Sequence, residues 1–257
     1  MIHISLHPEE LFTVAGFAVT NSIIVSTAIL VLFAGVGILL RRRFALVPGM
    51  AQNIAESGME ALFDLMDQVL GDRKKSEKYL PLVATIFLFV LLSNWMGLLP
   101  GIGSIVFHNG EEVSPLLRSP STDLNFTLAL AIISVLSINL IGIGTIGVAK
   151  HAKKFFNFKN PIEFFVGILE LISEFVRIIS FSFRLFGNIF AGEVLLVVTQ
   201  FLLPYVLPVP FIMMETFVGL IQAFIFAMLT LVFISVAVED HGEEHVEANK
   251  RLMTNNK

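Results

Sequence analysis

The chain alternates between long apolar runs and short polar stretches. Several of the apolar runs reach about 20 residues, the length of helix that crosses a hydrocarbon core of about 30 Å. The pattern therefore predicts an all-α integral membrane protein with five membrane-embedded helices. They are expected over 14–40, 80–99, 124–148, 162–203 and 210–238.

A further segment, 48–70, has a different pattern, in which acidic residues follow one helical face and apolar residues occupy the rest. The acidic residues are Glu56, Glu60, Asp64 and Asp67. We therefore expect this segment to form an amphipathic helix that lies at the membrane surface, or packs on the bundle without crossing the membrane.

Composition supports a membrane protein and excludes several other classes. Of 257 residues, 55% are hydrophobic and 15% are charged, whereas soluble domains carry about 25% charged residues. The net charge of −4 gives no basis for a nucleic-acid partner, and the absence of cysteine excludes disulfides. The run at 14–40 is not typical of a cleaved signal peptide, because residues 1–10 contain no Lys or Arg and the basic cluster Arg41–Arg43 follows it.

The charges of the connecting segments predict the orientation of the chain. Basic residues flank the surface helix and fill the segment after 148, whereas the segment at 100–122 carries Glu111 and Glu112 with Arg118 as its single basic residue. The basic residues are Arg41, Arg42, Arg43, Lys74, Lys75, Lys78, Lys150, Lys153, Lys154 and Lys159. Basic segments face the cytoplasm, so the N-terminal segment 1–13 is expected outside and the polar tail 239–257 inside.

The segment 162–203 is unusually long for a membrane helix. Its 42 residues would make a helix of about 60 Å, twice the thickness of the hydrocarbon core. It is either a re-entrant hairpin or one steeply tilted helix, and the absence of a central proline favours the tilted helix. With the last apolar segment it is expected to form a long, strongly tilted hairpin over 161–238.

Polar residues of this long segment share one narrow stripe of a helical wheel. They are Glu170, Ser173, Arg177, Ser180, Arg184 and Asn188. Glu193 lies on the opposite face, and the last segment adds Glu215 and Gln222, which share a face because they are seven residues apart. The stripe is expected to run from the cytoplasmic side to the middle of the membrane.

Arg184 stands among apolar residues, roughly 30 Å from either end of its segment, too far to reach water along its own helix. A charged side chain at that depth costs about 2.5–3.5 kcal/mol. An internal ion pair that only holds helices together is one explanation, but the polar stripe favours a proton or ion route. Arginine stays protonated and cannot relay a proton. Arginine is therefore suited to act as a barrier between two proton or ion routes. Its counter-charge is expected to come from another chain.

Four stretches resemble one known family. "SFSFRLFGNIFAGE" (180–193) and "METFVGLIQAFIFAMLTLVFI" (214–234) resemble the last two membrane helices of subunit a of rotary F-type ATP synthases. "LLSNWMGLLPG" (91–101) and "STDLNFTLALA" (121–131) resemble the preceding spans of that family. The resemblance implies a stationary subunit beside a rotating ring of subunit c, with two offset half-channels that load and unload a ring carboxylate with protons.

The resemblance also assigns roles to individual residues. Arg184 matches the arginine that faces the ring carboxylate and separates the half-channels, and Asn188 and Gln222 match polar residues beside it. Glu193 and Glu215 match positions of the outer half-channel, and Asp123 and Asn125 match its entrance. Positions of the inner half-channel are matched by Glu170, Ser173 and Ser180. Glu215 stands where some bacterial relatives have histidine, and Arg177 where many members have lysine. We expect the carboxylates of Glu193 and Glu215 to interact.

The resemblance further implies partners: the subunit c ring, the peripheral-stalk subunit b and the remaining ATP synthase subunits. The location would be the plasma membrane of a bacterium or, alternatively, the mitochondrial inner membrane. No cofactor, metal or catalytic site is implied, because ATP chemistry resides in partner subunits. The alternative is a self-contained proton- or sodium-coupled transporter, which usually needs broken helices and an internal repeat. The coupling ion stays open, since ligands in the ring determine it.

Overall fold

The computed structural model describes residues 10–14, 17–43, 49–99, 106–109, 112–115, 118–148, 151, 161–204 and 206–239. Within these ranges the helices are α1 (Asn21–Arg43), α2 (Met50–Leu70), α3 (Arg73–Met96), α4 (Leu124–Ile146), α6 (Pro161–Leu202) and α7 (Pro208–Glu239). Two antiparallel strand pairs and one short 3₁₀ helix complete the described elements: β1 (Glu10–Val14) with β2 (Phe17–Thr20), β3 (Val106–Asn109) with β4 (Glu112–Pro115), and η2 (Pro120–Thr122). The tail predicted beyond Glu239, Glu111 and the lysines of 149–160 lie outside the described residues.

Four of the described helices are long and apolar enough to cross a membrane, namely α1, α3, α4 and α7. The expectation of a multi-pass membrane protein is therefore confirmed at this level. The predicted fifth span corresponds to α6, which is not one of the four. Because α6 carries six charged residues along its 42 positions, its placement in the membrane stays a prediction.

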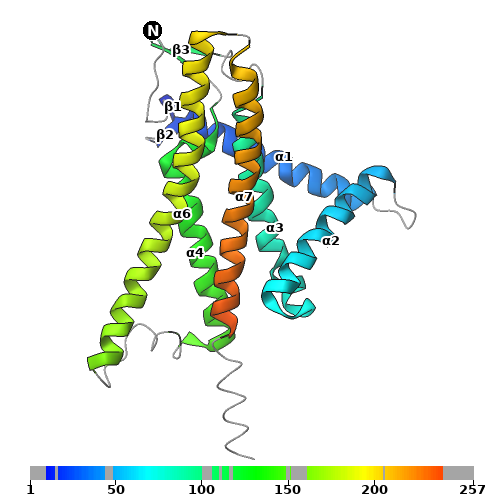
Figure 1. Cartoon of the computed structure of the whole chain (residues 1–257), viewed down its shortest axis with the longest axis vertical. Helices are drawn as coiled ribbons and strands as arrows, with labels where there is room; N and C mark the ends of the chain where they lie inside the picture. The colour runs from blue at the N-terminus through cyan, green and yellow to red at the C-terminus, as the bar shows by residue number, and fades with distance from the viewer. Residues whose placement is uncertain are drawn as a thin grey trace, which may run out of the picture.

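Helices α3, α4, α6 and α7 form the central bundle, in which α4 contacts both α6 and α7, and α3 packs along α7. Figure 1 shows α6 and α7 side by side near the turn that joins them and separating toward their other ends, where α4 lies between them. The core consists of apolar side chains from all four of these helices, with a contribution from α2. Its fully buried members include Val83, Val90, Leu185, Leu231 and Ile234.

Helix α6 is continuous from Pro161 to Leu202. Of the two shapes considered for this segment, the structure therefore has the single helix and not the re-entrant hairpin. Both helices begin with a proline, Pro161 in α6 and Pro208 in α7. Proline suits the first position of a helix, because the N–H that it lacks would have no intrahelical partner there. The tilt of the pair relative to a membrane stays a prediction.

The first helix begins at Asn21 and not at residue 14, which corrects its predicted start. Thr20 acts as the N-cap, since its Oγ1 accepts a hydrogen bond from the backbone N–H of Ile23 at 3.4 Å. The preceding residues pair as β1 and β2, and the outer segment contains a second pair, β3 and β4. The fold is thus not purely helical. The apolar run at 14–20 is rich in Val, Phe and Thr, which favour strands as readily as helices.

The third helix begins at Arg73, seven residues before its predicted start at residue 80. Asp72 caps it by accepting a hydrogen bond from the backbone N–H of Lys74 at 3.0 Å. The first two turns of α3 are therefore polar, and hydropathy alone does not detect them. Helix α2 ends at Gly71, which has a φ of 67°, a left-handed conformation that suits glycine.

Helix α2 packs on α3 and α7 rather than joining the central bundle, and Figure 1 shows α1 and α2 reaching away from it on one side. Its apolar face is anchored by the fully buried Met66. Arg73 binds Asp67 at 2.8 Å and stacks on the Phe63 ring at 3.9 Å. Glu56, Glu60 and Asp64 are exposed, so α2 is amphipathic, and its place at the membrane surface stays a prediction.

Candidate functional site

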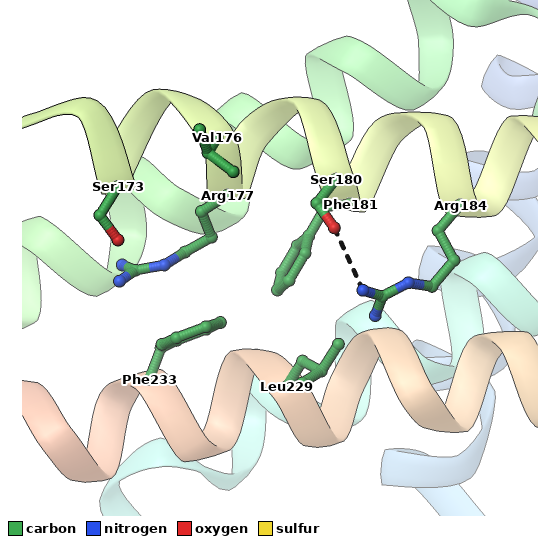
Figure 2. A pocket seen from close by; sticks show the side chains of 8 residues that line it. All are labelled: Ser173, Val176, Arg177, Ser180, Phe181, Arg184, Leu229 and Phe233. Carbon is green, nitrogen blue, oxygen red and sulfur yellow. Dashed lines mark hydrogen bonds between the residues drawn. The ribbon is translucent and has the colours of Figure 1, made fainter.

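A groove of about 220 Å³ lies between α6 and α7. Figure 2 shows its lining, in which polar side chains come from α6 and the opposite wall is apolar and comes from α7. The lining residues from α6 are Ser173, Val176, Arg177, Ser180, Phe181 and Arg184, and those from α7 are Leu229 and Phe233. Four members of the predicted polar stripe therefore share one groove, because their spacing places them on one face of α6.

Arg184 lies at one end of this groove. Its Nη2 donates a hydrogen bond to Ser180 Oγ at 3.1 Å (Figure 2), and the side chain is exposed. In the described part of the chain, no carboxylate lies within ion-pair distance of its guanidinium. The structure thus presents a permanent positive charge on the outer surface of α6, without an internal counter-charge.

Asn188 and Gln222 meet one helical turn beyond Arg184. Asn188 Nδ2 donates a hydrogen bond to Gln222 Oε1 at 2.8 Å, which joins α6 to α7. Gln222 is only 2% exposed, and its Nε2 has no hydrogen-bond partner within the described ranges. A buried amide donor without a partner is unusual. It leaves Gln222 able to donate to a water molecule held within the bundle.

Glu215 is a buried carboxylic acid at the contact between α7 and α6. It is 6% exposed, and its carboxyl group lies directly against Gly192, so that a methyl group at position 192 would overlap it. Glu193 follows Gly192 on α6, so both glutamates belong to this contact region. A side chain at 192 would therefore require the Glu215 carboxyl group to leave the position it occupies against the α6 backbone.

Glu193 also has a cationic partner that was missed at the sequence level. Arg118 Nη2 lies 3.2 Å from Glu193 Oε2, and the Arg118 side chain is only 10% exposed. Arg118 Nε donates a hydrogen bond to Thr122 Oγ1 at 3.1 Å, which fixes the guanidinium on η2. One signal was present in the sequence, because Arg118 is the single Lys or Arg between Lys78 and Lys150.

Asp123 has mainly structural contacts. Its Oδ1 accepts a hydrogen bond from the backbone N–H of Asn125 at 2.9 Å, which caps α4. Its Oδ2 accepts one from Ser22 Oγ at 2.7 Å, which ties α1 to α4. The side chain of Asn125 is exposed, and in the described part of the chain it makes no hydrogen bond with Glu193 or Glu215. The two residues therefore adjoin the Arg118–Thr122 contact without entering the glutamate cluster.

Glu170 is half-buried and is not one of the residues that line the groove. Arg177 does line it, and forms an ion pair with Glu174 at 2.9 Å. Within the described ranges, no three acidic or imidazole side chains gather closely enough to hold a metal ion. The site thus consists of a hydroxyl- and arginine-lined groove on one side of Arg184, and a buried carboxylate cluster on the other.

Comparison with known proteins gives consistent matches over nearly the whole chain. The sequence profile of the family described as ATP synthase A chain matches residues 21–235, from the start of α1 to within α7. ATP synthase subunit a of Campylobacter fetus is 38% identical over 225 residues, covering 86% of this chain and 90% of the relative. The same subunit of Helicobacter pylori is 34% identical over 239 residues, covering 90% and 96%. That of Moorella thermoacetica is 30% identical over 241 residues, covering 94% and 100%.

Proposed function

The chain belongs to the ATP synthase A chain family, and from this premise we propose that it is the stationary, non-catalytic membrane subunit of an F-type ATP synthase. Two offset half-channels carry protons to and from a carboxylate on a rotating ring of subunit c, which couples proton flow to rotation. ATP chemistry takes place in partner subunits. The chain lies in the plasma membrane of a bacterium, with its N-terminus outside, and binds the ring and the subunit b stalk.

The exposed guanidinium of Arg184 is the observation that carries this proposal. A permanent charge on a membrane helix is costly unless it finds a counter-charge or water, and no carboxylate of the described chain is within reach of it. A carboxylate on the neighbouring ring supplies that counter-charge. Each ring carboxylate must release its proton before it passes Arg184. While it passes, the guanidinium holds it in its ionised form.

The two routes approach Arg184 from opposite ends of α6. Ser173 precedes Arg184 by about 17 Å and Glu193 follows it by about 14 Å, at 1.5 Å per helical residue. The groove along Ser173 and Ser180 forms the inner half-channel. The cluster of Glu193, Glu215 and Arg118 forms the outer one. Since Arg184 stands between them and cannot relay a proton, protons cross only by riding on the ring.

During synthesis a proton moves from the outer solution to the Glu193–Glu215 pair, where two neighbouring carboxyl groups share protons more readily than two anions coexist. From there it passes to a ring carboxylate beside Asn188, which is exposed on α6 and is held in place by its hydrogen bond to Gln222. Rotation carries the protonated carboxyl around the ring to the groove. There it releases the proton toward the cytoplasm, before meeting Arg184 again.

Thiol labelling from each side of the membrane tests the two routes. The chain contains no cysteine, so single variants need no altered background. Ser173→Cys and Ser180→Cys are expected to react with water-soluble reagents preferentially from the cytoplasmic side, and Glu193→Cys from the outer side. Leu231→Cys serves as the control, because Leu231 is fully buried and the variant should react from neither side. The same sidedness at all three test positions would exclude offset routes.

The Arg118–Glu193 pair gives a second test of the outer route. Arg118→Gln leaves a partly buried carboxylate without its cation, and proton pumping is expected to fall by roughly two- to 150-fold, the factor that corresponds to the coupling energies of contacting side chains. The double variant Arg118→Gln/Glu193→Gln should lose less than the product of the two single losses. ATP-driven acidification of inverted vesicles measures this, and strictly multiplicative losses would show that the contact plays no part in transport.

A further inference from the structure

A second cavity lies on the other side of α6 from the groove, and one ion pair stands between the two. The cavity, of about 360 Å³, is between α4 and α6, and its polar lining residues are Asn139 and Glu174. Arg177 lines the groove. We propose that Glu174 is a positioning residue, which holds Arg177 against the groove wall and offsets its charge so that protons can use the groove. The inference rests on the proposed function of the groove as the inner half-channel.

The Arg177 guanidinium is fixed on two sides. Its Nη1 lies 2.9 Å from Glu174 Oε1, and the two side chains are 13% and 15% exposed. Its Cζ lies 3.8 Å from the centre of the Phe233 ring on α7, a distance typical of a cation–π contact. Figure 2 shows Arg177 and Phe233 facing each other across the groove. The cation is therefore held at the edge of the space through which water reaches Ser180.

Glu174 is itself held from α4. Asn139 Nδ2 donates to its second oxygen, Oε2, at 3.3 Å, and also to the backbone oxygen of Val135 at 3.0 Å. Asn139 Oδ1 lies 3.1 Å from His151 Nε2. A chain of polar contacts thus runs from His151 through Asn139 and Glu174 to Arg177, and it connects α4 with α6.

The surroundings of Glu174 distinguish this pair from an ordinary surface pair. An exposed ion pair at i and i+3 contributes little to a helix. Here both partners are largely buried, and the remaining residues around the second cavity are apolar. They are Ile132, Val135, Leu136, Leu171, Phe175 and Ile178. A carboxylate in such surroundings needs a partner, and Arg177 meets that need while pointing into the groove.

Without Glu174, two changes in the groove are expected. The long, flexible Arg177 side chain would no longer be tied to one wall and could extend over Ser173 or Ser180. Its positive charge would also be uncompensated, so protons would bind less readily along the route to Arg184. Among charged and titratable groups, Arg177 pairs with Glu174 directly, Glu170 precedes it by one turn on α6, and His151 is connected to it through Asn139. The described α7 side chain that faces Arg177 is the uncharged Phe233.

The test is ATP-driven proton uptake by inverted vesicles across a series of external pH values. In these vesicles the cytoplasmic groove takes up protons, so weaker proton binding moves the alkaline limb of the pH profile to lower pH. For Glu174→Gln we expect pumping to fall by roughly two- to 150-fold. The alkaline limb should shift by about one pH unit, the effect of one uncompensated charge about 12 Å from the protons it repels at an effective dielectric constant of about 20. Glu60→Gln, on the exposed face of α2, is the matched control and should leave both unchanged.

Charge compensation separates positioning from packing. Glu174→Gln/Arg177→Gln removes both charges, and its alkaline limb should return to the position seen in the unaltered complex. Glu174→Asp keeps the negative charge, so its alkaline limb should stay where it is in the unaltered complex, although pumping should be slower. The inference would be overturned if the alkaline limb of the pH profile did not shift in Glu174→Gln. It would also be overturned if that limb stayed displaced in the double variant. The proposed function fails separately, if Arg184→Ala continues to pump.

Discussion

Arg184→Ala is expected to abolish ATP-driven proton pumping while the ATP synthase complex still assembles. The side chain is exposed, and its hydrogen bond in the described chain is with Ser180, so its loss leaves no buried partner unsatisfied and no cavity in the bundle. What is lost is the fixed positive charge that ionises each passing ring carboxylate. Removing one preorganised charge-stabilising group from a water-poor site commonly costs a factor of roughly one hundred to one thousand.

Lysine should not replace Arg184. An ammonium group can lose its proton in an apolar setting, and it lacks the planar set of donors that fits a carboxylate. Acidification of inverted vesicles, normalised to the amount of assembled complex, measures both variants. Lys74→Gln is the control, since it removes an exposed cation at the start of α3. Normal pumping by Arg184→Ala would remove this residue from the mechanism.

Gly192→Ala is expected to have the second largest effect. A Cβ atom at this position would overlap the Glu215 carboxyl group, so either the carboxyl group must move or α6 and α7 must separate. Overpacking of this kind costs about 1–3 kcal/mol. Because Glu215 is buried at this contact, its displacement should also interrupt the outer half-channel, and we expect pumping to fall at least roughly tenfold.

Gly144→Ala is the matched control for Gly192→Ala. Gly144 is also in a helix, but nothing lies within 4 Å of a Cβ atom added there, so alanine should be neutral or slightly stabilising. Shortening the acid in Gly192→Ala/Glu215→Asp should restore part of the pumping by making room for the methyl group. Thermal unfolding and vesicle acidification measure these effects, and equal behaviour of the two single glycine variants would refute the contact.

The features that were predicted from sequence are those set by local periodicity. A continuous apolar run and the absence of an internal proline predict one long helix, and α6 is such a helix from Pro161 to Leu202. The spacing of Ser173, Ser180 and Arg184 places them on one face whatever packs against them, and they line one groove. Helical geometry alone therefore accounts for the groove's polar side.

The features that were not predicted depend on contacts between distant segments. Arg118 and Glu193 are 75 positions apart in the sequence, and nothing local indicates that η2 lies against α6. Asp123 illustrates the same point, since its carboxylate caps α4 and binds Ser22, 101 positions away. The contact between Asn139 and Glu174 likewise requires knowing which faces of α4 and α6 meet.

The strands and helix starts were missed for a different reason. Hydropathy does not distinguish an apolar strand from the first turns of an apolar helix, so β2 and the last residue of β1, Val14, were assigned to the helix that follows them. The opposite error affected α3, where the charged residues after Asp72 continue the helix into water. In both cases a single capping side chain, Thr20 or Asp72, determines the boundary.

Passive proton flow through the membrane sector tests the central claim, that Arg184 separates two routes, most directly. Vesicles carrying Arg184→Ala complexes, stripped of their catalytic sector and given a potassium-diffusion potential, are compared with vesicles of the unaltered complex. If the guanidinium is a barrier, its removal should leave passive proton flow equal or increased while ATP-driven pumping is lost. Loss of passive flow together with pumping would contradict the account, because it would make Arg184 a part of the proton's path and not the barrier between two paths.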